Sequence, residues 1–155
     1  MENVTQASYL QRACESTGVY CLAYKDVSKF YFQGPRADQL NELPITDRDK
    51  YNGMIMGLAG FFIGRPSLPD TSNPMVCYDA ACPNCYQDRV ITKRLQFIDT
   101  YMVECPTCHR TYNLDDRGYV YKTPENEDQD PAHNRRLIRY QVHYYPNQFT
   151  LVVSN

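Results

Sequence analysis

Four cysteines in two closely spaced pairs are the residues of this chain whose types and spacing could do chemistry. The first pair lies in Cys82-Pro83-Asn84-Cys85 and the second in Cys105-Pro106-Thr107-Cys108, with nineteen residues between them. This spacing is typical of four-cysteine metal sites. Two thiolates with two residues between them can bind one ion from a tight turn, and two such turns that face each other complete a tetrahedron. The sequence therefore predicts a metal bound by these four cysteines, and the alternative is free or disulfide-bonded cysteines in loops.

The composition favours a β-rich fold in which many short elements position the cysteines. The chain has 14 tyrosines and no tryptophan, and its 10 prolines and 7 glycines are spread along its length. Tyrosine, valine, isoleucine and phenylalanine favour a pleated, half-buried surface. A chain of 155 residues can bury most of its apolar surface without needing a metal to fold. We therefore expect one domain, residues 1–155, with an all-β fold.

The pattern along the chain predicts one short helix followed by strands. The helix is expected within residues 2–15 and is ended by Thr17-Gly18. Strands are expected at residues 19–24, 29–32, 54–63, 75–78, 89–97, 100–104, 112–114, 119–121, 138–144 and 149–153. Loops are expected at residues 35–52, 64–74 and 123–135. A hairpin made of residues 89–97 and 100–104 would carry the chain out and back, so that the second cysteine turn meets the first.

Charge and hydropathy exclude several classes of protein. The 16 Lys and Arg residues and 18 Asp and Glu residues give a net charge of -2, which argues against a nucleic-acid-binding surface. No segment reaches the ~18–20 apolar residues of a membrane span. The N-terminus as given has no signal-peptide pattern. Because there is no Ser/His/Asp arrangement, phosphate loop or nucleotide fingerprint, we do not expect an enzyme.

Three further cysteines lie outside the two pairs, at Cys14, Cys21 and Cys77. In an oxidising compartment a disulfide could join Cys14 to Cys21. The sequence leaves this pairing open, because connectivity does not follow from cysteine spacing alone.

Residues 54–155 resemble a Rieske-type iron–sulfur domain. An apolar strand precedes Tyr78-Asp79-Ala80-Ala81-Cys82-Pro83, which is similar to the start of the first Rieske cluster loop. Residues 105–114 are similar to the second cluster loop, 115–118 to the turn after it, and 137–153 to the last two strands of the family. More closely, the chain resembles Rieske-like cell-envelope lipoproteins of unassigned function from Bacteroidetes. The resemblance implies stacked antiparallel sheets, a small metal-loop subdomain at about residues 78–114, and a location in the cell envelope or periplasm.

The ligand set departs from that family. In a Rieske centre, two cysteines hold one iron and two histidines hold the other. The resemblance places Cys82 and Cys105 at the cysteine positions, whereas Asn84 and Cys108 stand where the histidines are expected. We therefore expect an all-thiolate site on Rieske-like loops, with Asn84 and His109 next to the ligands. His109 could hydrogen-bond a thiolate and tune it, and the alternative is an exposed polar loop residue.

Several metals suit four thiolates. Two short cysteine turns can hold Zn²⁺ or a single iron, as in a zinc-ribbon or rubredoxin-like site. Four cysteines can also hold a [2Fe–2S] cluster. Zn²⁺ is favoured because the two turns are short and alike, and because the nearby positions offer no ligands for a second iron. Disulfides are a further alternative in an oxidising envelope.

The choice of metal leads to different functions. With Zn²⁺, the chain would be a non-catalytic binding module of the cell envelope, and its first fifty residues could dock a protein partner. With a [2Fe–2S] cluster or mononuclear iron, it would be an electron-transfer protein. A thiol–disulfide oxidoreductase is a weaker interpretation, because reactive CxxC pairs lie at helix N-termini in βαβ units, whereas these pairs are expected among strands.

Overall fold

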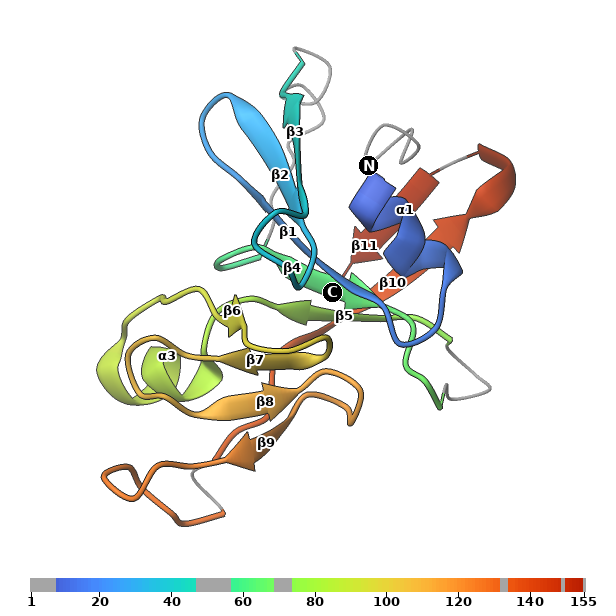
Figure 1. The fold of residues 1–155 in the computed structure, drawn as a ribbon. Coiled ribbons are helices and arrows are strands. Elements are labelled where there is room, and N and C mark those ends of the chain that lie inside the picture. The colour runs from blue at the N-terminus through green and yellow to red at the C-terminus, as the bar shows by residue number, and fades with distance from the viewer. Residues whose placement is uncertain (1–7, 47–56, 69–73, 132–133, 149, 155) are drawn as a thin grey trace.

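Two antiparallel sheets are stacked in the computed structural model, which describes residues 8–46, 57–68, 74–131, 134–148 and 150–154 (Figure 1). The larger sheet has seven strands in the spatial order β11 (Thr150–Ser154), β10 (Arg139–Tyr145), β5 (Val76–Asp79), β4 (Phe61–Gly64), β1 (Tyr20–Lys25), β2 (Lys29–Gln33) and β3 (Leu40–Pro44). The smaller sheet has four strands in the order β6 (Gln96–Phe97), β7 (Met102–Glu104), β8 (Thr111–Asn113) and β9 (Tyr119–Lys122). The predicted all-β fold is confirmed.

Few helices accompany the sheets in the described part of the chain. They are α1 (Ser8–Glu15), α3 (Pro83–Arg89) and the short 3-10 helix η2 (Pro146–Gln148). Among the residues that the structure describes, no helix is long and apolar enough to cross a membrane. Of these helices, α3 carries Cys85 of the predicted metal site, and α1 packs on the larger sheet.

The larger sheet separates two hydrophobic cores. In β1, Tyr20 and Leu22 face one core, whereas Cys21 and Ala23 face the other. This alternation is expected, because successive side chains of a strand point to opposite faces. All four side chains are buried, since each face of the sheet is covered.

The first core lies between the larger sheet and α1. The sheet is strongly curved, and α1 occupies its concave side (Figure 1). Leu10, Ala13 and Cys14 are fully buried against the strands, at the three- and four-residue spacing of a helix face. Burying a leucine stabilises the fold by about 1.5–3 kcal/mol, so Leu10 is a main anchor of this helix.

The second core lies between the two sheets and contains the four paired cysteines. Phe62 and Tyr78 of the larger sheet pack here with Val103 and Tyr112 of the smaller one. After β5, the chain passes through Ala80 and Ala81, both fully buried, directly to Cys82. The cysteines therefore belong to the interior of the molecule.

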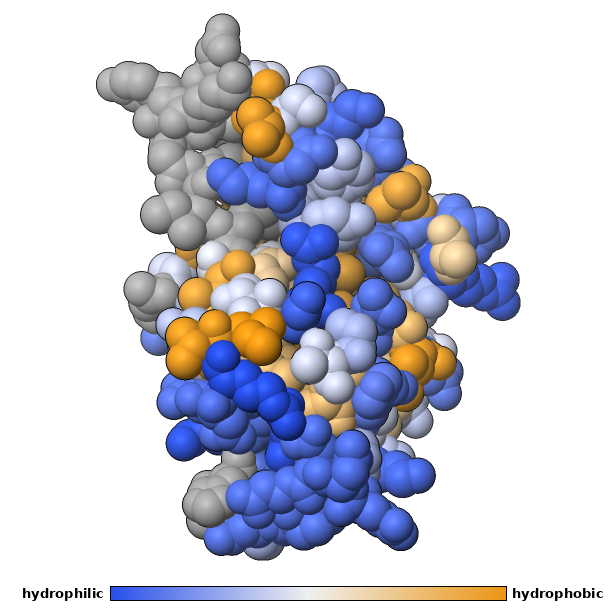
Figure 2. All heavy atoms as spheres, turned by 90° about the vertical axis from the view of Figure 1, so that its left-hand side faces the viewer, coloured by the Kyte–Doolittle hydropathy of each residue, from blue (hydrophilic) through white to orange (hydrophobic). Residues whose placement is uncertain are grey.

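The surface around α3 is mainly hydrophilic. Figure 2 shows the side of the molecule on which α3 and β6 lie, and apolar side chains form only small groups on it. Large exposed apolar side chains come from separate connections between elements, for example Val27, Leu58 and Val90. The lower end of this side, where the chain runs after β9, is hydrophilic.

Most of the predicted elements are confirmed. The strands predicted at 19–24, 29–32, 75–78, 112–114, 119–121, 138–144 and 149–153 correspond to β1, β2, β5, β8, β9, β10 and β11. The predicted helix at 2–15 corresponds to α1, which begins at Ser8, and residues 2–7 lie outside the described part of the chain. The expected alternation of side chains along β10 is confirmed. Tyr140, Val142 and Tyr144, at every second position, all face the first core.

The loop predicted at residues 35–52 is wrong where it contains β3. This strand has the sequence Leu-Asn-Glu-Leu-Pro, which includes residue types that are rare in strands. It is an edge strand, and its pairing with β2 along its whole length supplies the order that its own sequence lacks. Pro44 at its end is tolerated because an edge strand does not need every N–H for pairing.

Three predicted strands are shorter than expected. The strand predicted at 100–104 is reduced to β7, which begins at Met102. The strand predicted at 54–63 begins only at Phe61, because Gly57 and Gly60 have φ values of +60° and +104° and form a turn, while residues 54–56 lie outside the described part. The strand predicted at 89–97 is reduced to β6, because Arg89 ends a helix instead.

Candidate metal centre

Each cysteine pair lies where a strand of the second core ends. Cys82 follows β5 and precedes α3, which contains Cys85 in its first turn. Cys105 follows β7, and Cys108 lies in the turn before β8. The stacking of the two sheets thus brings together residues that are 20 and 26 positions apart in the sequence.

The four sulfur atoms form one compact, buried group. The Sγ atoms of Cys82 and Cys108 are 3.7 Å apart, and so are those of Cys85 and Cys105. All four Sγ atoms lie within 4.8 Å of one another. None of the four residues is more than 1% exposed. The group could hold a metal ion, and the cysteines are not disulfide-bonded.

The two cysteine turns are not alike, which corrects the prediction. Residues 83–89 form α3, with Pro83 at the first helical position, where a missing N–H and a fixed φ are favourable. The second pair lies in a tight turn, in which the N–H of His109 donates to the carbonyl of Cys105 over 2.9 Å. Residue 109 has a φ of +60°, which lets the chain reverse into β8.

Asn84 lies behind the sulfur group and orients Tyr112. The backbone N–H of Arg135 donates to Asn84 Oδ1 over 3.0 Å, and Asn84 Nδ2 donates to the Tyr112 hydroxyl oxygen over 2.8 Å. The Tyr112 hydroxyl lies 3.2 Å from Cys82 Sγ. Because its oxygen already accepts from Asn84, its proton is free to point at the sulfur. Asn84, which was expected next to the ligands, thus reaches the sulfur group through Tyr112.

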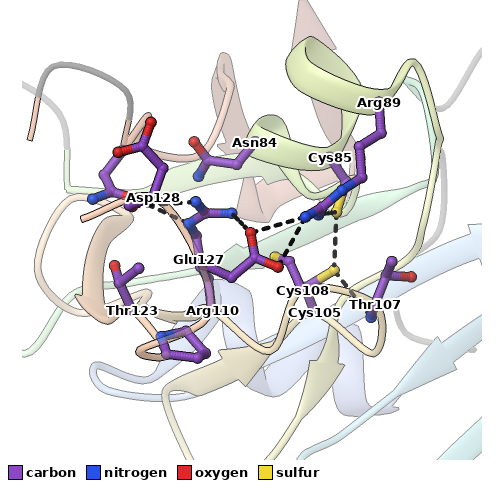
Figure 3. A network of polar contacts seen from close by, with 12 residues as sticks. Asn84, Cys85, Arg89, Cys105, Thr107, Cys108, Arg110, Thr123, Glu127 and Asp128 are labelled. Carbon is purple, nitrogen blue, oxygen red and sulfur yellow. Dashed lines mark hydrogen bonds and ion pairs between the residues drawn. The ribbon is translucent and has the colours of Figure 1, made fainter. Parts of the chain in front are cut away.

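Further donors reach the other sulfurs (Figure 3). Arg89 Nη1 lies 3.5 Å from Cys85 Sγ, four residues earlier on the same helix. The backbone N–H of Thr107 donates to Cys105 Sγ over 3.4 Å. Hydrogen bonds of this kind favour the thiolate form, which is the form that binds metals.

Arg110 lies beside Cys108 and is almost completely buried, with 1% exposure. Its charge is balanced by Glu127, whose Oε2 lies 3.4 Å from Arg110 Nη1. Glu127 also accepts from Arg89 Nη2 with both carboxylate oxygens, over 2.8 and 2.9 Å. One carboxylate therefore connects Arg89, which contacts Cys85 Sγ, to Arg110, which lies beside Cys108 (Figure 3).

The protein environment changes the acidity of these groups. Burial raises the pKa of Cys85 from 9.0 to about 11. Hydrogen bonds from Cys105 and Cys82 lower the pKa of Cys108, which also has Arg110 beside it. Burial raises the pKa of Tyr112, so its hydroxyl keeps the proton that it can donate to sulfur. An ion that binds here must therefore displace protons from some of the cysteines.

His109 is placed at the surface. Its ring Nδ1 lies 2.9 Å from Glu104 Oε1, and its side chain is 60% exposed. Within the described residues, no hydrogen bond is seen between this ring and a cysteine sulfur. His109 is therefore an exposed polar loop residue, which is the alternative to a thiolate-tuning role that the sequence left open.

Sequence reasoning missed the groups that surround the sulfurs, namely Tyr112, Arg89, Arg110 and Glu127. Arg89 could have been found if residues 83–89 had been recognised as a helix, because residues four apart are neighbours on a helix. No sequence signal connects Glu127 to the site, since the fold alone brings it there.

The remaining cysteines lie in the first core, away from the paired ones. Cys14, Cys21 and Cys77 are buried free thiols, so the disulfide considered between Cys14 and Cys21 is not formed. Burial raises the pKa of Cys14 to about 12. These three cysteines act as small apolar residues.

Comparison with known proteins gives this chain no relative. No family model matches it, and no curated protein or solved structure is found to be similar.

Proposed function

We propose that Cys82, Cys85, Cys105 and Cys108 hold one Zn²⁺ ion that has a structural role. The observation that carries the proposal is the separation of the sulfurs, all within 4.8 Å of one another. Zn–S bonds of about 2.3 Å in a regular tetrahedron require sulfurs about 3.8 Å apart. The two measured pairs, at 3.7 Å, agree with that length.

A single ion fits better than a two-iron cluster. In a [2Fe–2S] cluster with four cysteines, two sulfurs bind each iron. The two ligand pairs must then be further apart than the sulfurs around one ion. The compact group of four sulfurs supports a mononuclear site.

A structural role is supported by the ligand set. Catalytic zinc sites keep a position open for water or substrate, whereas structural sites are closed by four protein ligands. Here four buried thiols supply all four positions. The ion would connect α3 to the turn before β8, and so hold the smaller sheet against the end of the larger one.

The rest of the functional hypothesis rests on the sequence. We propose that the chain is a non-catalytic binding module of the cell envelope, related to Rieske-type domains that have lost their histidine ligands. Two stacked antiparallel sheets with both cysteine pairs beside the smaller one support this relationship. Fractionation of the native cells tests the location, and recovery of the chain only in the cytosol would contradict it.

Electron transfer by a single bound iron is the second candidate. It is favoured by the donors around the sulfurs, from Tyr112, Arg89 and Thr107. Hydrogen bonds to cysteine sulfur are one of the ways in which proteins set the reduction potential of an iron–thiolate site.

Metal analysis together with a visible spectrum of freshly purified, untagged protein separates these candidates. We expect one zinc ion per chain and no colour. Iron with visible absorption would support electron transfer instead, and its ratio to protein would distinguish one iron from two. Absence of any bound metal would contradict both candidates.

Variants assign the ligands. Cys82→Ser and Cys105→Ser are expected to lose the metal, because each removes one of four thiolates. Cys77→Ala, which alters a buried cysteine of the other core, is the control and should keep full metal content. Full metal content in either serine variant would refute the four-thiolate site.

A further inference from the structure

The acidic strap, residues 123–131, runs past the sulfur group and contributes no side chain to either hydrophobic core (Figure 3). None of these nine residues, all of which the structure describes, is fully buried. The strap closes on itself, since Gln129 Nε2 donates to the carbonyls of Pro124 and Glu127 over 2.5 and 3.0 Å. Its position on the molecule must therefore come from polar contacts.

Glu127 supplies the contacts of this kind that reach both halves of the metal site. Its carboxylate accepts two hydrogen bonds from Arg89 and forms an ion pair with the buried Arg110. Only 11% of the Glu127 side chain is exposed. Arg110 adds a weaker contact to the strap, because its Nη2 lies 3.4 Å from the carbonyl of Asp128.

The two arginines belong to the two halves of the metal site. Arg89 ends α3, which carries Cys85, and Arg110 lies two residues after Cys108. An ion would join the same two halves through sulfur. The carboxylate of Glu127 and the ion are therefore parallel cross-links between α3 and the second cysteine turn.

Parallel cross-links stabilise each other. Whichever one forms first fixes the distance between the two halves, so the second forms without repeating that entropic cost. Such coupling is reciprocal: if the strap raises the affinity for the ion, then the ion holds the strap in place by the same factor.

Charge adds to the coupling. Four thiolates around a dication leave a net charge of -2, which the guanidinium groups of Arg89 and Arg110 offset. These two cations would repel each other without a carboxylate between them. Glu127 thus holds both of them on one carboxylate, Arg89 in contact with Cys85 Sγ and Arg110 beside Cys108.

We propose that Glu127 is a positioning residue that couples the acidic strap to the bound ion, so that the strap slows release of the ion and is itself ordered by it. This inference rests on the proposed metal site. It extends that site by a regulatory element, because any event that draws Glu127 away from the two arginines will loosen the ion.

The test compares Glu127→Gln with Glu125→Gln in the zinc-loaded full chain. Both substitutions remove one negative charge from the strap, but Glu125 is exposed. Transfer of zinc to a chromogenic chelator is followed in time. We expect release from Glu127→Gln to be about tenfold faster than from the wild type, within the range of typical coupling energies. Release from Glu125→Gln should match the wild type.

Amide hydrogen exchange of residues 123–131 gives an independent readout. In the wild type, exchange should be slower with zinc than without it, and in Glu127→Gln this difference should disappear. Equal release rates for the two variants, or strap exchange that is unaffected by zinc, would overturn the coupling while leaving the metal site intact. A wild-type chain that takes up no zinc would overturn the metal site and the coupling together.

Discussion

Tyr112 connects the buried polar groups around the centre to one of its sulfurs, and its hydroxyl can be tested alone. Tyr112→Phe removes the donor to Cys82 and leaves one Nδ2 hydrogen of Asn84 without its 2.8 Å acceptor, while Nδ2 keeps its 3.3 Å contact with the carbonyl of Arg135. Because a buried donor without a partner costs about 1–3 kcal/mol, we expect a loss of about 2 kcal/mol in the free energy of unfolding of the zinc-loaded protein. Urea denaturation measures this loss.

The matched control is Tyr121→Phe, which removes a hydroxyl from a side chain that is 69% exposed. Its stability should equal that of the wild type. If both tyrosine variants were equally stable, the hydroxyl of Tyr112 would have no role in the buried network.

Val90 is a residue in an unfavourable backbone conformation. It caps the C-terminus of α3 with a φ of 53°, and it is 84% exposed. A non-glycine residue in the left-handed region costs about 1–2 kcal/mol, whereas glycine adopts it freely. We expect Val90→Gly to raise the free energy of unfolding by about 1 kcal/mol, measured as a higher urea midpoint.

Val27→Gly provides the comparison, because Val27 is 91% exposed and is not among the residues with positive φ. It should bring no gain in stability. A Val90→Gly variant that is no more stable than the wild type would show that the surrounding structure already relieves the strain.

At the scale of elements, Asp79 joins the turn before β4 to the end of β5. Its buried carboxylate accepts from the N–H groups of Leu58, Ala59 and Ala81 and from the hydroxyl of Tyr140. Since Cys82 is only three residues away, this anchor also fixes where the first cysteine pair begins. A carboxylate with four donors needs its full acceptor capacity.

Asp79→Asn turns one acceptor oxygen into a donor that faces other donors. We expect it to lower the free energy of unfolding by about 3 kcal/mol, because charge-assisted hydrogen bonds are lost in a buried place. Thermal or urea unfolding measures the effect. Asp38→Asn, at an exposed position, should have no effect, and equal stability of the two variants would argue against this anchor.

The sequence is informative about strands that alternate or that are rich in β-favouring residues. Alternation along residues 138–144 predicts β10, which packs one face on the first core, and the β-rich segment 19–24 predicts β1, which is buried on both faces. The strand β3 and the helix α3 were missed. Pairing with a neighbour orders β3, and α3 is only seven residues long, too short to show a helical period.

The site was predictable in part for the same physical reason. The spacing of the cysteines is local information, and it identified all four members of the sulfur group. The contacts of Arg110 and Glu127 depend on how a loop after β9 folds back, which no local pattern records.

At the scale of the whole molecule, binding of the ion should depend on pH. Burial raises the pKa of Cys85 to about 11, so below that pH the ion-free protein carries a proton there that binding must displace. The affinity for zinc should therefore rise with pH up to about pH 11 and fall in acid. Zinc occupancy in a buffered chelator, measured at several pH values, checks the sign, and occupancy independent of pH would contradict it.

The order of strands shows where the segment that carries the cysteines joins the larger sheet. β5 and β10 are neighbours, and the N–H of Asp79 donates to the carbonyl of Ile138 over 2.8 Å, so the chain leaves and rejoins the larger sheet at one place. Everything between, both cysteine pairs included, is an insert whose two ends adjoin in the larger sheet. Phe62 and Tyr78 of the larger sheet are buried beneath this insert. Grafting the insert onto another protein would therefore require a sheet surface that matches these two side chains.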